Sequence, residues 1–485
     1  MPGTPLGVAL RALADADPDR PALTHDARTV TRRELERRTN RLARAYAALG
    51  VRPDSFVTIG LPNGIEFFEA VIAAWKVGAT PQPVSDKLPR AEREAIIALA
   101  DPCLVVGMDE AEAGGRASLP AGFEPDPGLS DAALPPAIAA SWKAPTSGGS
   151  TGRPKLIVAT QPAVLESIVP LARVLRMRDD GVHLLTGPLY HNGPLACAIC
   201  ALLTGSHVVI MGRFDAERTL ALVEQHRVDW LYLVPTMMQR IWRLPAEVRT
   251  RHDLSSLVAV MHMAAPCPPW LKREWIDWLG PERILELYGG TEAQAFTEIR
   301  GDEWLAHPGS VGRPVLGEVR VLDAEGKEAP PGEVGEVWMR RGAGAPPSYR
   351  YVGAKAKVRE DGWESLGDLG RMDAEGYLYL ADRETDMILV GGANVYPAEI
   401  EAALDEHPAV GSCCVIGLPH EDLGDVPHAI LQLDSEISDE ALLAHLGERL
   451  AKYKLPRSFE RVREPLRSEA GKVRRSALRA ERVAR

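Results

Sequence analysis

The sequence predicts an α/β fold, with parallel sheets and helices in its N-terminal part, then a region of short antiparallel strands, then a small α+β unit. Three observations predict it. Short apolar runs alternate with helical patterns up to about residue 300, Gly and Pro punctuate short strands from Ser310 to Arg341, and the pattern changes again after Arg383. Strands that alternate with helices imply βαβ units, whose parallel strands are buried and continuously apolar.

The first elements show this alternation clearly. Arg32–Leu49 places apolar and Ala residues on a helical repeat, with Thr31 in the N-cap position. The apolar run Phe56–Leu61 predicts a strand that ends at a Pro-Asn-Gly turn, and Glu66–Val77 predicts the next helix. Further elements are expected as strands at Cys103–Val106, His183–Leu185, His207–Ile210, Trp230–Val234, Leu257–Met261 and Ile284–Leu287, with a helix at Ala216–Gln225.

The last hundred residues predict a separate α+β unit. We place the domain boundary at about residue 384, which gives a large domain over 1–383 and a small one over 384–485. In the small domain we expect strands Met387–Val390, Ser412–Gly417 and His428–Leu433, and helices Ala398–Glu406 and Asp439–Lys452.

Composition narrows the class of protein. Of 485 residues, 45% are hydrophobic and 25% charged, which excludes a disordered chain, and only six are cysteines, which excludes a disulfide scaffold. The net charge of −11 argues against a general nucleic-acid-binding protein. We expect a cytoplasmic protein with no membrane span, because the N-terminus does not resemble a signal peptide and the apolar stretch Gly193–Gly205 is shorter than the roughly 20 residues a membrane helix needs.

Two further features have alternative interpretations. Cys197 and Cys200 are spaced like half of a zinc site, but no second CxxC pair exists, so we expect them to be small core residues. The segment Arg449–Arg485 holds thirteen Lys or Arg residues against four Glu. Such a run indicates either a solvated face or a surface that meets a polyanionic cofactor such as coenzyme A (CoA) or a nucleotide phosphate.

The most specific local motif is the Gly- and hydroxyl-rich segment Ser147–Lys155. Its glycines let the backbone approach an anion closely, its hydroxyls donate hydrogen bonds, and Lys155 adds charge. The spacing is not that of a Walker A loop, and the strand-like run Leu156–Ala159 follows it instead of a helix. We therefore expect a phosphate-binding loop between strands, with a surface hairpin as the alternative.

A second motif is Tyr288–Glu292, at the end of a predicted strand. Its aromatic ring offers a stacking surface, and its carboxylate could bind Mg²⁺. Parallel α/β folds place ligands at such strand ends.

Together these segments resemble the adenylate-forming superfamily, which includes acyl-CoA synthetases, peptide-synthetase adenylation domains and luciferases. Four more segments are similar to its motifs, in the same order along the chain: Pro188–His191, Gly367–Leu369, the hinge region Asp382–Glu401, and Gly471–Arg475. The residues of these motifs are most similar to those of bacterial acid–CoA ligases of the bile-acid or aromatic-acid type. The resemblance implies a large domain of two α/β subdomains plus a β subdomain, followed by a small mobile α+β C-terminal domain.

The resemblance also implies site residues. ATP would be bound by Ser147, Gly148, Gly149, Ser150, Thr151, Gly152, Lys155, Tyr288, Gly289, Gly290, Thr291, Asp368, Arg383 and Lys472. Thr151 and Glu292 would position Mg²⁺, Tyr288 would stack on adenine, and Asp368 would accept hydrogen bonds from the ribose. Lys472, His191, Thr151 and Glu292 would be the catalytic residues, with Lys472 between the substrate carboxylate and the α-phosphate and His191 at the acid pocket. That pocket would draw on Tyr190–Leu195, Met261–Pro266 and Tyr288–Phe296.

Three departures from the family pattern are visible. Gly148 stands where relatives carry Ser or Thr, Thr385 stands where the hinge has Asp or Lys, and Arg467–Ala470 lacks the usual lead-in to the catalytic lysine. None of them removes a group that adenylation requires.

The function implied is an ATP-dependent acid–CoA ligase that acts through an acyl-adenylate, with a small carboxylic acid, ATP, Mg²⁺ and CoA as ligands, in a monomer or homodimer. The absence of an appended carrier domain favours CoA as the acceptor. The alternatives are an enzyme with another acceptor, such as an ATP- and nitrite-dependent diazotase of aromatic amines or a carrier-protein or amide ligase, and a non-catalytic nucleotide-binding homologue. The presence of Thr151, Glu292, Asp368, Arg383 and Lys472 argues against the last.

Overall fold

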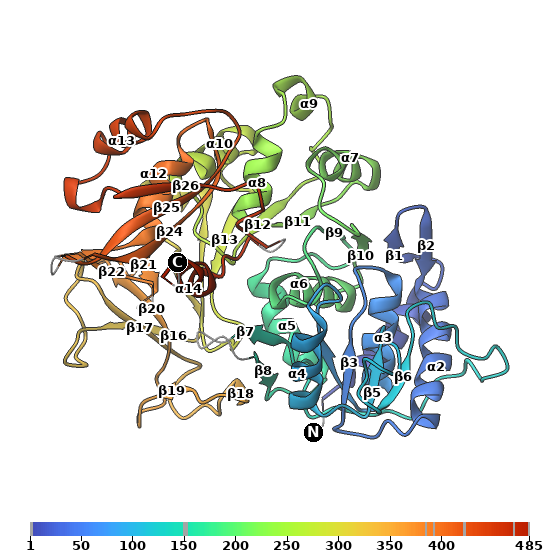
Figure 1. The fold of residues 1–485 in the computed structure, drawn as a ribbon. Helices are drawn as coiled ribbons and strands as arrows, with labels where there is room; N and C mark the ends of the chain where they lie inside the picture. Colours follow the sequence, from blue (N-terminus) through green and yellow to red (C-terminus); the bar gives the residue numbers. More distant parts are fainter. Residues whose placement is uncertain are drawn as a thin grey trace.

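The computed structural model describes residues 3–148, 154–383, 386–390, 393–420, 423–468 and 471–483. Figure 1 shows the N-terminal elements, in blue, at one end of the molecule and the C-terminal elements, in orange and red, beside helix α8 (Pro235–Trp242). Within the described ranges, no helix combines the length and apolarity needed to cross a membrane.

The largest sheet in the described ranges has nine strands, and its centre is parallel. Neighbouring strands from β1 to β13 run parallel, and antiparallel strands close both edges. Its spatial order is β15 (Arg313–Leu316), β14 (Phe296–Arg300), β13 (Ile284–Tyr288), β12 (Ala259–His262), β11 (Trp230–Leu233), β9 (Val182–Leu185), β10 (His207–Ile210), β1 (Pro21–His25) and β2 (Arg28–Thr31).

A second parallel sheet packs beside the first. Its order is β4 (Thr80–Pro83), β3 (Phe56–Ile59), β5 (Leu104–Val106) and β6 (Ala117–Leu119). The two sheets confirm the predicted βαβ organisation, because each predicted N-terminal strand overlaps an observed one.

The helices of this part follow from local signals. Helix α2 begins where predicted, because Thr31 accepts a hydrogen bond from the Glu34 amide while the Glu34 carboxylate accepts one from the Thr31 amide. The other N-terminal helices cover the two parallel sheets. The bounds are α1 (Leu6–Ala16), α2 (Arg32–Ala48), α3 (Ile65–Lys76), α4 (Arg90–Ala100), α5 (Leu165–Val174), α6 (Asn192–Leu203), α7 (Ala216–His226), α9 (Ala246–Thr250), α10 (Pro269–Leu279) and α11 (Gly301–Ala306).

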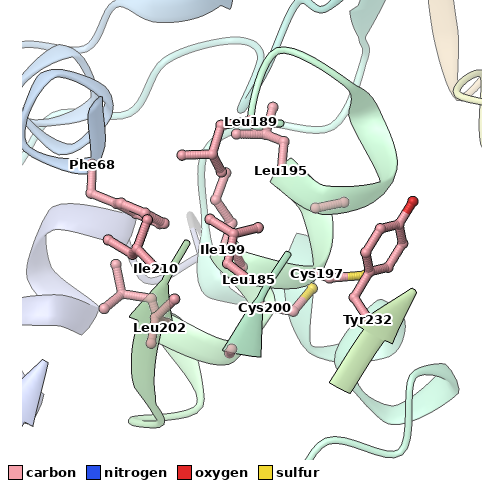
Figure 2. Packing of buried hydrophobic residues seen from close by; sticks show 14 of the residues in the cluster. Phe68, Leu185, Leu189, Leu195, Cys197, Ile199, Cys200, Leu202, Ile210 and Tyr232 are labelled. Carbon is pink, nitrogen blue, oxygen red and sulfur yellow. The ribbon is translucent and has the colours of Figure 1, made fainter. Parts of the chain in front are cut away.

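Helix α6 is the apolar stretch noted in the sequence, and it lies in the core. Every residue from Pro194 to Leu203 is buried. Figure 2 shows Cys197 and Cys200 among apolar side chains, including Leu185 and Ile199, which fits their interpretation as small core residues.

A region of antiparallel strands follows, as the turn signals predict. One sheet contains β16 (Glu318–Leu322), β17 (Gly335–Arg340), β20 (Glu364–Met372) and β19 (Lys357–Val358), with β21 (Leu378–Arg383) paired to β20. A smaller sheet joins this region to the N-terminal part through β18 (Tyr349–Val352), β8 (Pro154–Ala159) and β7 (Thr146–Gly148).

The C-terminal domain has its own apolar core. Its strand order is β23 (Ala393–Val395), β22 (Ile388–Val390), β25 (Gly424–Leu433) and β24 (Val410–His420), and β26 (Ser458–Arg461) runs parallel to β25. Its helices are α12 (Pro397–Asp405), α13 (Asp439–Gly447) and α14 (Arg475–Val483).

Two details of this domain differ from the sequence prediction. The helix expected over Asp439–Lys452 ends at Gly447, and a short 3-10 turn at Lys452–Lys454 replaces its last turn. Gly447 lowers helix propensity there, and Leu446 and Leu450 already face the core. Helix α14 was not predicted, because its apolar residues are too few among three arginines.

Candidate active site

The predicted phosphate loop connects two antiparallel strands. Ser147 on β7 pairs with Lys155 on β8, and Gly148 pairs with Pro154. Gly149, Ser150, Thr151 and Gly152 lie outside the described residues. A strand follows the loop, so the predicted strand-to-strand arrangement is confirmed.

Glu292 lies directly beside this hairpin. Lys155 Nζ is 3.7 Å from Glu292 Oε1, and the Tyr351 hydroxyl donates a hydrogen bond of 2.6 Å to the same oxygen. Lys155 Nζ also lies 3.8 Å from the centre of the Tyr351 ring. The Glu292 side chain is nearly buried, so a lysine and a phenol hold this carboxylate at the edge of the loop.

Sequence reasoning missed Tyr351. It comes from β18, about 200 residues after the loop, and it reaches the site because β18 pairs with β8. Burial, followed by the Glu292 charge, raises the pKa of Tyr351, so its hydroxyl remains a donor at neutral pH. The alternating aromatic pattern Tyr349–Val352 indicates a strand, but nothing local shows which strand it joins.

A second contact joins Tyr288 and Asp368. The Tyr288 hydroxyl donates a 2.7 Å hydrogen bond to Asp368 Oδ2. Asp368 lies on β20 opposite Arg383 on β21, so the backbone places both predicted ribose residues side by side.

The glycines after Tyr288 are required by close packing. A Cβ atom on Gly289 would lie 2.4 Å from a Phe296 ring carbon. A Cβ atom on Gly290 would lie 2.4 Å from Leu366 and 2.8 Å from the Glu292 carboxylate. Together with Thr291, they keep the turn close to Glu292.

His191 and Lys472 approach one another from different domains. His191 is the N-cap residue of α6, and its ring lies 4.5 Å from that of Tyr190. Burial, and to a lesser extent the Lys472 ammonium, lower the pKa of His191 to about 3, so its imidazole is neutral. A Cβ atom on Gly471 would lie 3.1 Å from Thr236 Oγ1, which places the backbone before Lys472 against the start of α8.

A buried glutamate holds both ends of the lysine segment, which we call the Lys472 loop (residues 467–475). The Glu401 carboxylate on α12 accepts hydrogen bonds from Arg475 Nη2 at 2.7 Å and from Arg467 Nη2 at 3.3 Å. Within the loop, the Lys472 amide and the Ser468 hydroxyl are 3.2 Å apart. Sequence reasoning did not identify Glu401 as part of the site.

Among the described residues, two cation–carboxylate contacts cross between the domains in this arrangement. Arg243, at the end of α8, donates to Asp434 at 2.5 Å and to the backbone oxygens of Val410 and Gly411. Arg474 lies 3.3 Å from Glu92 on α4. These contacts accompany the placement of Lys472 near His191.

Most cations of the basic C-terminal segment also have carboxylate partners. The pairs are Arg449–Glu406, Lys454–Glu399, Arg461–Asp439, Arg467–Glu401, Arg474–Glu92, Arg475–Glu401, Arg479–Asp425 and Arg482–Glu460. The positive charge of this segment is therefore largely balanced by acidic residues, of which Glu460 belongs to the segment and the others lie elsewhere in the chain.

The structure pairs the predicted residues in two groups: the hairpin residue Lys155 lies beside Glu292, which has the donor type that Mg²⁺ prefers, and Lys472 lies near a neutral histidine, His191. The family model described as AMP-binding enzyme matches residues 10–349, and its C-terminal domain model matches residues 399–472. The chain belongs to the AMP-binding enzyme family.

Relatives in this family include CoA ligases. A feruloyl-CoA synthase from an Amycolatopsis species is 33% identical over 96% of both chains. The structure of an o-succinylbenzoate CoA synthetase from Bacillus subtilis with its acyl-adenylate intermediate matches with a TM-score of 0.85 at 27% identity, over 99% of this chain and 98% of that one. An amide bond synthetase from Marinactinospora thermotolerans matches with a TM-score of 0.80 at 27% identity, over 98% and 99% of the chains.

Proposed function

We propose that this protein is an AMP-forming acid–CoA ligase. A carboxylic acid and ATP give an acyl-adenylate and pyrophosphate, and the CoA thiol then gives acyl-CoA and AMP. The observation that carries the proposal is the approach of Lys472 to His191, together with the Ser147–Lys155 hairpin in which Lys155 lies beside Glu292, because adenylation needs a cation where two anions come together.

The ATP side would be formed by the hairpin and the Tyr288–Asp368 pair. Ser147, Gly148 and Lys155, with the residues between them, would bind the phosphates, and Asp368 with Arg383 would bind the ribose. The Tyr288 ring would stack on adenine while its hydroxyl holds Asp368. A carboxylate can accept hydrogen bonds from both ribose hydroxyls.

The donor set also fits Mg²⁺. Glu292 supplies a carboxylate oxygen, which Mg²⁺ prefers, and the Thr151 hydroxyl and the ATP phosphates would complete its ligands. In the described ranges, no group of three or more His, Cys, Asp and Glu side chains could hold a metal, so the ion would enter with the nucleotide. When bound, Mg²⁺ would neutralise charge on the phosphates.

The acid side would lie around His191. Its neutral imidazole does not attract the substrate carboxylate away from Lys472, whose ammonium would bridge that carboxylate and the α-phosphate. The second half-reaction would follow rotation of the small domain, from about residue 384 onward, around a hinge at Arg383–Asp386. Thr385, the departure in this hinge, lies outside the described residues. A cytoplasmic monomer or homodimer remains a prediction from the sequence.

One alternative acceptor has a specific observation in its favour, the similarity to an amide bond synthetase. The decisive experiment is a pyrophosphate-release assay with a panel of acids, each with and without CoA, with an amine, and with nitrite. A CoA ligase releases pyrophosphate once per enzyme without acceptor and turns over only with CoA. Turnover with amine or nitrite but not with CoA would overturn the proposal.

A further inference from the structure

The first turn of α6 meets two other elements beside His191. Gly193 lies so close to β11 that an added Cβ atom would be 3.0 Å from the Tyr232 hydroxyl and 3.5 Å from Met263 Sδ. Met263 follows β12, and His191 is the residue that caps α6. Tyr232 therefore reaches the region where the acid pocket is expected.

The Tyr232 hydroxyl has no hydrogen-bond partner among the described residues and its oxygen is not fully enclosed, although the side chain as a whole is only 1% exposed. Buried hydroxyls in proteins normally have a partner. Burial raises the pKa of Tyr232, so the phenol stays protonated and able to donate. In Figure 2 the ring lies beside Cys197, and its oxygen points away from the labelled apolar side chains.

Lys143 brings a buried cation to the same helix. Its side chain is 4% exposed, and its ammonium donates a hydrogen bond to the Asn192 side-chain oxygen, one residue after His191. Nζ also lies 4.6 Å from the centre of the Trp142 ring. Across the part of the chain that the structure describes, no ion pair within 4.0 Å joins a carboxylate to this ammonium, which has three donors, and the Glu292 carboxylate acts on it only from farther away.

Lys143 and Tyr232 approach consecutive residues in the first turn of α6, because Lys143 donates to Asn192 and the Tyr232 hydroxyl lies against Gly193. The first turn of α6 contains no acidic residue, and no side chain caps it. A cation at a helix N-terminus is electrostatically unfavourable on its own, and a negative or electron-rich group placed there would relieve this.

We propose that Lys143 and Tyr232 form the polar end of the acid pocket, where they bind an oxygen acceptor that the substrate acid carries at a distance from its reacting carboxylate. This proposal rests on the proposed function and names its substrate class. Both groups donate hydrogen bonds, and one is charged, so the site selects a phenol, hydroxyl or second carboxylate. A hydrocarbon acid of the same size leaves both donors buried without a partner, and such sites discriminate strongly against analogues that lack the polar group.

The test compares three acids that differ only at the distal position: cinnamate, 4-hydroxycinnamate and 4-carboxycinnamate. For the wild-type protein we expect kcat/KM for pyrophosphate release to be at least about tenfold higher with an oxygenated acid than with cinnamate. In Lys143→Met the preference for 4-carboxycinnamate falls at least about tenfold, and in Tyr232→Phe the preference for 4-hydroxycinnamate falls several-fold. Which acid the wild type prefers distinguishes an anionic from a neutral acceptor.

A matched control is Tyr46→Phe. Tyr46 is fully buried with an unpartnered hydroxyl, but it lies on α2 beside Glu66 and Glu69 of α3, so the acid preference remains that of the wild type. A structural role for Lys143 would lower kcat/KM for all three acids alike and leave their ratios unchanged. That result, or a wild-type protein without preference, would overturn the proposal.

Calorimetric Kd values for the same acids separate this proposal from the proposed function. The ratios of Kd report the polar end of the pocket without any turnover. A protein that binds oxygenated acids preferentially but makes no acyl-CoA would overturn the ligase and retain the pocket. Equal Kd values for the three acids, together with acyl-CoA formation, would overturn the proposed pocket and retain the ligase.

Discussion

Two buried lysines of the N-terminal domain differ in what surrounds them. Lys272 on α10 is 0% exposed, and its Nζ lies 2.5 Å from Glu286 Oε2 and 5.2 Å from the Trp304 ring centre. Lys143 is 4% exposed and has the neutral side chain of Asn192 as its hydrogen-bond acceptor. Burying an ammonium group costs several kcal/mol unless a partner charge offsets that cost.

The difference distinguishes charged side chains that are paired within the fold from charged side chains that face a ligand. Lys272 and Glu286 balance each other between a helix and β13, and the pair needs nothing else. Among the described residues, Lys143 has no carboxylate within ion-pair distance, with Glu292 acting only from farther away, and it contacts Asn192 in the first turn of α6, next to His191. The Glu401 cluster follows the first pattern, because two arginines balance one buried carboxylate, and it supports a third lysine, Lys472, that is itself exposed.

The largest effect is expected for Lys472→Ala. If Lys472 offsets charge in the adenylation transition state, acyl-adenylate formation falls by about three orders of magnitude or more, with little change in ATP affinity. Formation of acyl-CoA from supplied acyl-adenylate persists. Rapid-quench measurement of each half-reaction checks this, and an equal loss in both would contradict the assignment.

The next largest effect is expected on stability, when each of the two buried lysines is replaced by Met. Lys272→Met leaves Glu286 buried and unpaired, so the free energy of unfolding falls by about 3–5 kcal/mol. Lys143→Met removes a buried cation that has no carboxylate partner, so the protein stays as stable or becomes more stable by up to about 3 kcal/mol at pH 7. Urea unfolding of both variants measures the difference in sign.

The pH dependence of the free energy of unfolding provides a second test of this comparison. Burial lowers the pKa of Lys143 from 10.5 to about 8, so the folded state disfavours the protonated lysine. The resulting cost is fully present below pH 8 and disappears as pH rises from 8 towards 10.5, where the unfolded chain also loses the proton. The stability advantage of Lys143→Met should therefore shrink between pH 8 and 10. A constant advantage would show that burial does not lower the pKa of Lys143.

Much of the fold was predictable from local signals. The strands of the parallel sheets are short apolar runs, and the capping box at Thr31 marks the start of α2. The motifs around Lys155, Tyr288, Asp368 and Lys472 were also visible, because each is a compact local pattern.

The parts that were not predicted depend on pairing across long stretches of chain. Tyr351 reaches Glu292 only because β18 pairs with β8, and Glu401 meets Arg467 and Arg475 only after α12 and the Lys472 loop pack together. Lys143 is an ordinary lysine in the sequence. Its burial is set by α6, about fifty residues later, so no local pattern shows its charge to be unbalanced.

A smaller effect is expected for Glu401→Gln. The substitution keeps the shape of the side chain but removes the charge that holds both ends of the Lys472 loop. Acyl-adenylate formation should fall about tenfold through kcat, with the ATP KM and thiolation from supplied acyl-adenylate nearly unchanged. The control is Glu460→Gln, which breaks the Arg482 pair in the same domain without touching the loop. Similar losses in both variants, or in both half-reactions, would indicate general destabilisation of the domain.

The smallest effect concerns the contact that joins the domains. Arg243 and Asp434 are partly exposed, and exposed ion pairs contribute about 0–1 kcal/mol. Arg243→Ala should therefore lower acyl-adenylate formation only about two- to five-fold. Because the backbone oxygens of Val410 and Gly411 also lose their donor, the loss should appear in the half-reaction that needs Lys472 near His191, and thiolation should persist or rise. Arg227→Ala breaks a comparable exposed pair with Asp253 inside the N-terminal domain and should change neither half-reaction. If Arg243→Ala slows thiolation instead, this contact belongs to the second arrangement of the domains, and the balanced charges at the interface do not position Lys472.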